Sequence, residues 1–444
     1  MTARPCFVPL ADVLAQVRTG PFGSVLHKHE YIRGGVPLVN PMHINGGQVT
    51  PTAEMAVSEG KACELADFAL SAGDVVIARR GEMGRCAVVQ SSQSGWLIGT
   101  GSMALTPSEH VLPEYLQRFL SSPESIAALE ANAVGSTMAN LNQGVLLNLQ
   151  IPFVSLSTQR NAVAKLDALT ARTARARIDL DRVPVLAEHY SRAVLAAAFS
   201  SIPEATEDVA VEQVALHIFD GPFGSHLKSA DYTDAGPRVI RLENIGHLKF
   251  NEDKRTFISE DKYTSLARHT LKADDVLFSS FVDEEVRVCL LPLLEGVAIN
   301  KADCFCVRVD TSKCDPRFLA YRLACHSTYE TFSAQVHGAT RPRVNLGQLR
   351  AFRFTLPSIS MQAEIVRRID VAFAEIDRLV AEAAAARRLL DRLDQAILAK
   401  AFRGELVPQD PNDEPAGVLL DRIRAERAAT PAKPARGRRA KAAA

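Results

Sequence analysis

The most regular pattern along the chain is a seven-residue spacing of apolar residues between Met361 and Phe402. A second apolar row follows three residues behind the first, among Ala, Arg and Glu residues. This spacing is typical of a coiled-coil seam, and ~42 residues rising 1.5 Å each make a helix about 60 Å long. The first row is Ile369, Ile376, Ala383, Leu390 and Ile397, and the second is Ala372, Leu379, Ala386 and Leu393.

A weaker copy of this pattern lies earlier in the chain. It consists of Leu166, Leu169, Ala176, Leu180, Val183, Ala187, Tyr190 and Val194. Proline has no amide hydrogen to donate inside a helix, so Pro184 predicts a kink or a break there. Because each apolar seam needs a partner, we expect the two helices to pair with each other in an antiparallel arrangement.

A duplication explains why the pattern occurs twice. The sequence GPFGS at 20–24 recurs at 221–225, an offset of 201 residues. Farther along, the offset becomes 203 and carries Pro113 to Pro316. The sequence therefore predicts two similar halves in tandem, with two extra residues in the second half.

Within each half, short apolar runs precede the helical seam. The runs that follow Asp74 and Asp275 are bounded by turn residues and predict short strands. Helical stretches are expected at Pro113–Leu129 and Pro316–Ala334. Each half should therefore hold a mixed α/β domain.

These patterns predict an α/β (α+β) fold with two globular domains, two long helices in an antiparallel coiled coil, and a pseudo-twofold tandem repeat. The expected segments are a first domain at 1–156, a central helical spacer at 157–203, a second domain at 204–358, a distal helical spacer at 359–405, and a C-terminal extension at 406–444.

Composition narrows the class of protein. The chain is 47% hydrophobic and 23% charged, as in folded globular proteins, and its net charge of zero means that any DNA contact must be local or shared with a partner. We expect a cytoplasmic protein, because there is no signal peptide pattern and no apolar run near the ~20 residues that span a bilayer. The eight cysteines predict reduced thiols, and Cys304 with Cys306 lacks further ligands for a metal site.

The predicted architecture allows two functions. Antiparallel helices would separate the two domains as a ruler does, and proteins that read two half-sites commonly space them about one helical turn, ~34 Å, apart. The loops differ between the halves, with HKH at 27–29 against KSA at 228–230, so the half-sites would differ. The same arrangement also suits a scaffold that presents two peptide-binding domains.

Enzyme motifs are weak in this sequence. The carboxylates of Glu252-Asp253-Lys254 and Glu260-Asp261-Lys262 lack the upstream Asp on an apolar strand that a nuclease site needs. We find no methyltransferase cofactor loop, P-loop or nucleophile elbow. We interpret GPFGS as a structural turn rather than a phosphate loop, and we expect Phe22 and Phe223 to pack into their domains.

Four longer motifs point to a family. They are GDVVIARRGEMGR at 73–85, GPFGSHLKSADY at 221–232, VIRLENIGHLKF at 239–250, and LDQAILAKAFRGELVPQDPNDEPAGVLLDRIRAER at 393–427. With these motifs and its duplicated order, the chain resembles the specificity subunits of type I restriction-modification systems over nearly its whole length.

The resemblance implies a non-catalytic subunit that binds a bipartite, asymmetric DNA site through two target-recognition domains. It also implies that two adenine-methylating subunits dock on the helices, and that a restriction and translocase subunit can join the complex. S-adenosylmethionine, ATP and Mg²⁺ would be used by those partners, and this chain would bind no cofactor and no membrane.

Basic and amide side chains in the recurring loops are the candidates for DNA contact, because they bind phosphates or base edges. Arg341-Pro342-Arg343 is the best single patch. The basic tail at 428–444 either adds nonspecific phosphate attraction or is only a solubilising extension. The candidates are Lys28, Arg79, Arg80 and Arg85 in the first domain, and Lys228, Arg241, Asn244, Arg341, Arg343 and Asn345 in the second.

Overall fold

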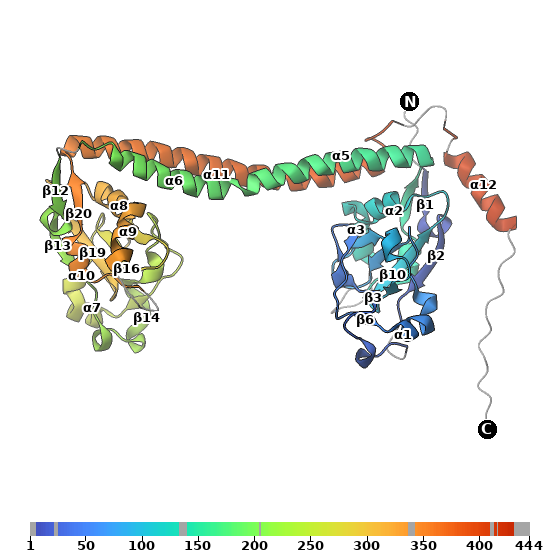
Figure 1. Ribbon diagram of the computed structural model, residues 1–444, viewed down its shortest axis with the longest axis horizontal. Coiled ribbons are helices and arrows are strands. Elements are labelled where there is room, and N and C mark those ends of the chain that lie inside the picture. The colour runs from blue at the N-terminus through green and yellow to red at the C-terminus, as the bar shows by residue number, and fades with distance from the viewer. Residues whose placement is uncertain are drawn as a thin grey trace, which may run out of the picture. The chain divides into compact units, whose positions relative to one another are not determined.

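The protein is a mixed α/β chain with two compact units. The computed structural model describes residues 6–21, 25–132, 140–203, 206–335, 342–408, 413–414 and 416–429. Unit 1 consists of 1–179 with 386–444, and unit 2 consists of 180–385. Helices and strands occur in both units, which confirms the predicted fold class (Figure 1). None of the described helices is long and apolar enough to span a membrane.

The two units have the same sheet topology. Unit 1 has a four-stranded sheet of order β2-β10-β7-β8, and unit 2 has β13-β19-β16-β17. Each unit adds a three-stranded sheet, β6-β3-β9 or β15-β14-β18, and a two-stranded ribbon, β1-β11 or β12-β20. Unit 1 also has the strand pair β4-β5, where the described part of unit 2 has the single bridge between Ile245 and Phe250. The predicted duplication is therefore present in the fold.

Unit 1 contains the strand predicted after Asp74, β7, and the expected helix at Pro113–Leu129 is two helices, α2 and α3. The elements are β1 (Cys6–Pro9), β2 (Leu14–Thr19), β3 (Val36–Val39), β4 (Ile44–Asn45), β5 (Gln48–Val49), β6 (Ala56–Val57), α1 (Glu59–Glu64), β7 (Val75–Ala78), β8 (Cys86–Val88), β9 (Leu97–Ile98), β10 (Ser102–Pro107), α2 (Pro113–Leu120), α3 (Pro123–Asn132), α4 (Gln143–Leu147), β11 (Gln150–Phe153), α5 (Leu156–Asp181) and α12 (Ala416–Ala429).

Unit 2 repeats this order except for the strands β4 and β5, and its predicted helix at Pro316–Ala334 is likewise divided. Its elements are α6 (Val183–Ser200), β12 (Glu207–Ala210), β13 (Ala215–Phe219), β14 (Tyr232–Ile240), β15 (Phe257–Ile258), α7 (Glu260–Leu266), β16 (Val276–Val282), β17 (Val286–Leu290), β18 (Ala298–Asn300), β19 (Cys304–Val309), α8 (Pro316–Ala324), α9 (His326–Gln335), α10 (Leu346–Ala351), β20 (Arg353–Leu356) and α11 (Ile359–Phe402), which continues into unit 1.

Helices and sheets form successive layers in each unit. In unit 2, α8 and α9 lie between the long helices and the four-stranded sheet, while β14 and α7 lie farthest from the helices (Figure 1). One hydrophobic core joins Leu195 of α6, Phe278 of β16, Phe318 of α8 and Ile369 of α11. In unit 1 the corresponding core includes Leu166 of α5 with the end of α11.

The pairing of the long helices is antiparallel, as predicted. In unit 2, α6 leads into β12 and β20 leads into α11, and these two strands pair antiparallel with each other. In unit 1, Leu166 shares a core with Ala401, whereas Arg177, farther along α5, donates to Asp394 at 2.7 Å. The helix also breaks between α5 and α6, and Pro184 lies in the first turn of α6, which confirms the predicted interruption.

The seam differs from the prediction in its second row. Four residues of the first row, Ile369, Ile376, Ala383 and Ile397, are buried. Leu379 and Leu393 of the second row are each 46% exposed. Some apolar residues of each long helix pack against the other long helix, and others pack into the core over the sheet of the same unit. Part of the second row therefore stays at the surface.

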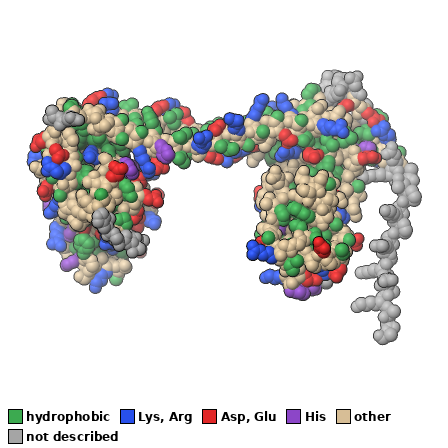
Figure 2. All heavy atoms as spheres, in the orientation of Figure 1, with side chains coloured by type: hydrophobic (Ala, Val, Ile, Leu, Met, Phe, Trp, Pro, Cys, Tyr) green, Lys and Arg blue, Asp and Glu red, His purple; other side chains and the backbone are tan. Residues whose placement is uncertain are grey.

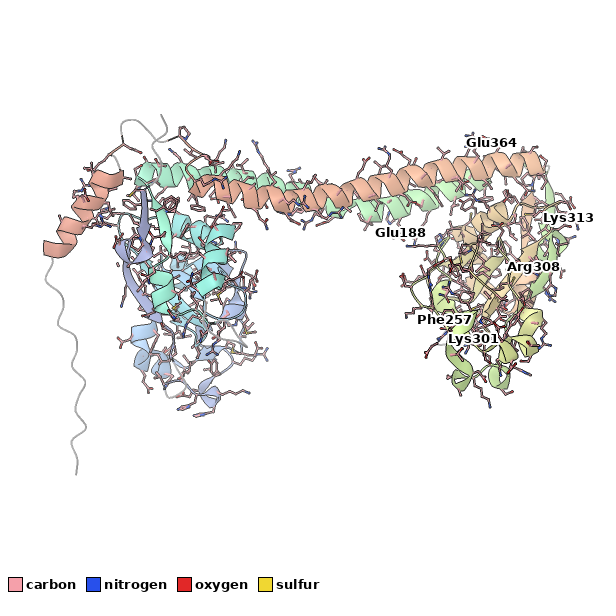
Figure 3. The ribbon with its side chains drawn as sticks, turned by 180° about the vertical axis from the view of Figure 1, so that it is seen from behind. Glu188, Phe257, Lys301, Arg308, Lys313 and Glu364 are labelled. Atoms are coloured by element: carbon pink, nitrogen blue, oxygen red, sulfur yellow. The ribbon has the colours of Figure 1, made fainter. Side chains whose placement is uncertain are left out.

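Each unit has an ion pair with a buried aspartate at its four-stranded sheet, but the arginine comes from a different strand in the two units. In unit 1, Arg18 of β2 binds Asp74, whose side chain is 1% exposed. In unit 2, Arg308 of β19 binds Asp275 through two bonds of 2.7 and 2.9 Å, and the Asp275 side chain is 2% exposed. Figure 3 shows Arg308 within the body of this unit.

The C-terminal segment completes unit 1. Leu420 and Ile423 of α12 are buried in the same core as Leu166. Asp413 accepts hydrogen bonds from Ser155, Ser157 and Thr158, where α5 begins. A carboxylate near this end of a helix is favourable because the helix dipole is positive there.

Candidate nucleic-acid interface

Each four-stranded sheet ends in a loop junction whose backbone contacts correspond between the two units. In unit 1, the amide of Arg79 donates to Gly101 and Arg80 forms a bridge with Asn140. In unit 2, the amide of Ser280 donates to Asp303 and Phe281 forms the bridge with Arg343. We name these pairs the bridge positions of the two units.

The two neighbouring arginines of unit 1 have different surroundings. Arg79 is only 9% exposed, and its Nε donates to the carbonyl of Leu141 at 3.1 Å. Burial, together with the charge of Arg80, lowers the pKa of the Arg79 guanidinium. Arg80 is exposed. Of the two candidates, Arg80 is therefore the one whose guanidinium is available to a ligand at the surface.

Arg343 lies over an aromatic ring. Its guanidinium carbon is 4.4 Å from the centre of the Phe281 ring, and its Nη1 is 3.7 Å from Asp303. The Arg343 side chain remains 58% exposed. Arg341, its predicted neighbour in the patch, lies outside the described residues.

Arg85 has an unpredicted equivalent in Arg287. The Nη1 of Arg85 donates to the carbonyl of Pro41 at 3.4 Å, and the Nη1 of Arg287 donates to that of Leu242 at the same distance. Pro41 and Leu242 are 201 residues apart, so the two contacts correspond. The signal in the sequence was the Arg that ends both RRGEMGR and SSFVDEEVR, which was obscured by the longer second hairpin.

Asn244 is a correction to the predicted interface. Its side chain is 1% exposed, and both amide hydrogens are donated, to Asn251 at 2.8 Å and to Lys254 at 2.9 Å. Its Oδ1 accepts from the Arg241 amide at 2.9 Å. Since a side-chain amide has only two hydrogens to donate, Asn244 holds its own loop and has none left for an adenine edge.

The remaining candidates lie on loops or at helix ends. Lys28 and Lys228 are exposed, and Asn345 is exposed at the start of α10, where its Oδ1 accepts from the Gln348 amide at 2.9 Å. Arg241 lies 5.7 Å from the centre of the Tyr232 ring. Lys301, which was not predicted, lies 5.1 Å from the same centre and donates to the Tyr232 hydroxyl at 2.6 Å.

The part of unit 2 away from the long helices is rich in cations. Figure 3 shows Lys301 farther from the helices than Arg308, and Figure 2 shows further Lys and Arg side chains on this part of the unit. The tyrosine thus joins Arg241 and Lys301 in one cluster. Such a cluster suits an anionic ligand.

The GPFGS motif is a structural turn, but its phenylalanine is exposed. A Cβ on Gly20 would lie 2.0 Å from the carbonyl oxygen of Gly99, and one on Gly221 would lie 2.1 Å from the Lys301 backbone. Only glycine allows this approach of two backbones. Phe223 is 57% exposed, so the prediction that it packs into the domain is wrong. Phe22 lies outside the described residues.

An acidic side chain adjoins the motif in unit 2. Burial, reinforced by the charge of Asp303, raises the pKa of Asp220 to about 6, although the Gly221 amide donates to it at 2.6 Å. The residue in the same place in unit 1 is Thr19. The surroundings of the two motifs therefore differ in charge and in pH dependence.

The long helices carry a second exposed surface. Hydrophobic side chains are visible on these helices between Lys and Arg side chains (Figure 2). Exposed apolar residues that lie close together are typical of surfaces that bind a protein partner. In unit 1 they are Ile178, Leu389 and Leu393, and in unit 2 Val185, Leu186, Tyr190, Val371 and Leu379.

Comparisons with known proteins relate this chain to DNA specificity subunits. Residues 26–179 match the family model described as the type I restriction modification DNA specificity domain. The type I restriction enzyme StySPI specificity subunit of Salmonella potsdam is 27% identical, and the EcoKI specificity subunit of Escherichia coli strain K12 is 25% identical, each over 90% of both chains. These relatives are named as specificity subunits, not as nucleases or methyltransferases.

Solved structures show the same fold. The crystal structure of the HsdS subunit from Thermoanaerobacter tengcongensis has a TM-score of 0.60 at 22% identity, over 90% of this chain and 97% of that one. A chain from a structural study of complex assembly and conformational transition in the type I R-M system has a TM-score of 0.65 at 20% identity, over 91% and 99%. The chain is thus similar to the specificity subunits of type I restriction enzymes along about nine-tenths of its length.

Proposed function

We propose that this protein is the non-catalytic subunit that selects the DNA sequence for a type I restriction-modification complex. Each unit would read one half of a bipartite, asymmetric site. One observation carries this proposal: the two units keep the same backbone contacts at the bridge positions but present different side chains there. Two copies of one fold with different exposed loops suit the reading of two different half-sites.

The proposed role leaves the chemistry to partner subunits. S-adenosylmethionine, ATP and Mg²⁺ would be bound by methyltransferase and restriction subunits in the cytoplasm. Glu260 and Asp261, which were weighed as nuclease carboxylates, lie in the first turn of α7, where Ser259 accepts from the Lys262 amide. They serve as ordinary acidic residues at a helix start.

We propose that two methyltransferase subunits dock on the long helices. Val185, Tyr190 and Val371 of unit 2 are 55–60% exposed, and Ile178 and Leu389 of unit 1 are 60–63% exposed. Because both units carry such residues, the helices offer one apolar surface in each half. The duplicated chain can therefore accept two copies of the same partner.

The test is to express the chain with its cognate methyltransferase and to map methylated adenines across the host genome. We expect a split motif with an unread centre, which is absent when this chain is omitted. Replacing the first globular domain by that of a relative should change one half of the motif only. Normal methylation without the chain would reject the proposal and favour the scaffold that presents two peptide-binding domains. If replacing the first domain changed both halves of the motif, the assignment of one half-site to each unit would be rejected.

A further inference from the structure

We propose that each unit needs one guanidinium at its bridge position and that this guanidinium binds a DNA backbone phosphate. Arg80 supplies the group in unit 1, and Arg343 supplies it in unit 2. The two arginines do not correspond in the duplicated sequence, because they occupy opposite members of the bridge. The inference rests on the proposed function and adds a specific contact to it.

The bridge geometry makes the two positions interchangeable. Residues paired across an antiparallel bridge point to the same face, with Cβ atoms ~4.5–5.5 Å apart. The pair is Arg80 with Asn140 in unit 1 and Phe281 with Arg343 in unit 2. A long arginine side chain covers this separation, so either member of the bridge can deliver a guanidinium to the same region.

The chain contains a precedent for such a relocation. In the buried ion pair, the cation is Arg18 in unit 1, while the matching place in unit 2 is held by Phe219. Arg18 pairs with Ala104 across the sheet, and Phe219 pairs with Cys306, so Ala104 and Cys306 correspond. Two residues farther along the same strands, Arg308 of unit 2 therefore corresponds to Thr106 of unit 1. Arg308 lies 5.8 Å from the centre of the Phe219 ring.

The reason for keeping the buried cation is internal. Asp74 and Asp275 are almost fully buried, and a buried carboxylate without a cation is strongly destabilising. The charge therefore persists while its strand changes. When both units keep a guanidinium but supply it from different positions, the unit needs the charge itself and not a residue at one particular position.

Among the described residues, no almost fully buried carboxylate accounts for the arginine at either bridge. Among the residues that the structure describes, Arg80 has no carboxylate within ion-pair distance. Arg343 lies 3.7 Å from Asp303, but its side chain is 58% exposed, and exposed pairs of this kind contribute little. Since the protein itself does not need this cation, the requirement points to an anionic ligand outside the chain.

A phosphate is the anion that best explains retention in both units. Base contacts should vary between units that read different sequences, whereas backbone phosphates are present at every site. Phe281 beneath Arg343 restricts the guanidinium at 4.4 Å and keeps it accessible. We therefore expect the bridge arginines to contribute affinity and positioning but no sequence preference.

The test uses the complex with its methyltransferase and a duplex that contains the mapped site. Arg80→Asn and Arg343→Asn should each weaken binding about tenfold near physiological salt and reduce the slope of log affinity against log salt by about 1. The methylated sequence should stay the same. Arg118→Asn is the matched control, because Arg118 pairs with Asp167 on the helices, and its slope should not change.

Transplanted pairs test the equivalence directly. Arg80→Phe with Asn140→Arg gives unit 1 the pair of unit 2, and Phe281→Arg with Arg343→Asn gives unit 2 the pair of unit 1. Both double variants should bind with wild-type affinity and salt slope. Thermal unfolding identifies a double variant that has failed to fold, and for that unit Arg80→Lys or Arg343→Lys, which keep the charge, should bind better than the Asn variant.

The outcomes separate the inference from the proposed function. If the wild-type complex binds its split site and both single variants keep the wild-type slope, the inference is overturned while the proposed function stands. A change in the methylated sequence would mean that the guanidinium reads a base, which overturns the phosphate assignment. Failure of the wild-type chain to direct binding or methylation would overturn both.

Discussion

The two units of this protein solve the same packing problem with different residues. At the same turn of the same helix, unit 1 has Phe119, whose ring meets that of Phe402 edge-on at 5.4 Å. Unit 2 has Arg322 there, which lies 5.9 Å from the Phe199 ring and 5.4 Å from the Phe352 ring. The phenylalanine at the end of the long helix is kept in both units, and its neighbour changes from an aromatic ring to a cation.

This comparison separates what the fold needs from what it tolerates. Both units keep a carboxylate bound to a guanidinium under the sheet, and both keep glycine where two backbones meet. Side chains that only fill space, or that face solvent, differ freely. Substitutions at corresponding positions should therefore have equal effects where the need is shared and unequal effects where it is not.

The largest effect is expected from the buried ion pair. Arg308→Met leaves Asp275 buried without a cation and should lower the free energy of unfolding by about 3 kcal/mol. Arg18→Met should cost about 1 kcal/mol less, because Asp74 keeps a hydrogen bond from the Thr106 hydroxyl at 2.6 Å. Urea unfolding of the full chain, followed by hydrogen exchange of peptides from each unit, measures both.

The control for this pair is Arg353→Met, which removes an exposed pair with Asp208 and should change stability by less than about 0.5 kcal/mol. Equal losses for Arg18→Met and Arg308→Met would contradict the role given to Thr106.

A smaller effect, equal in the two units, is expected at the GPFGS glycines. Gly20→Ala and Gly221→Ala each force a methyl group against backbone atoms that cannot turn away, so each should cost about 2 kcal/mol. Gly60→Ala in α1 meets nothing within 4 Å and should be neutral or slightly stabilising. Thermal unfolding of the three variants is the measurement, and an asymmetry between Gly20 and Gly221 would show that the two turns are not equivalent.

The smallest effect belongs to unit 2 alone. The pKa of Asp220 is raised to about 6 from an ordinary value of 3.8, so its stabilising contribution is complete below the lower value and is lost as the pH rises through the upper one. The loss should be of the order of 1 kcal/mol, because the side chain is partly exposed. Asp220→Thr, which installs the residue of unit 1, should flatten this pH dependence in hydrogen exchange of unit 2. An unchanged slope would assign it to other groups.

The sequence predicts the large elements of this fold well, since periodicity and internal repetition are local signals. The heptad row at Ile369, the break at Pro184 and the duplicated domains all follow from spacing along the chain. The sequence offset between the two halves changes from 201 to 203, and the structure shows that the two extra residues enter at two separate places. Arg85 and Arg287 already differ by 202, because the second hairpin is longer by one residue.

The candidate site is less predictable, because exposure depends on segments far apart in the chain. Asn244 is buried only because the loop to Lys254 folds over it, and in unit 1 the corresponding residue, His43, is equally buried at 1% exposed. Phe223 is exposed for the opposite reason, as the Gly221 turn carries it away from the core. Neither outcome is visible in residue type.

The return of the C-terminal segment to unit 1 has a consequence for synthesis on the ribosome. Unit 2 is contiguous, and all its residues have been made once residue 385 is added. Unit 1 begins first, yet the start of α5 lacks its contacts with Asp413, and the core lacks Leu420 and Ile423, until the end of the chain has been made. The unit that is translated first is therefore the last to be finished, and a chain truncated before α12 would carry a complete unit 2 and an incomplete unit 1.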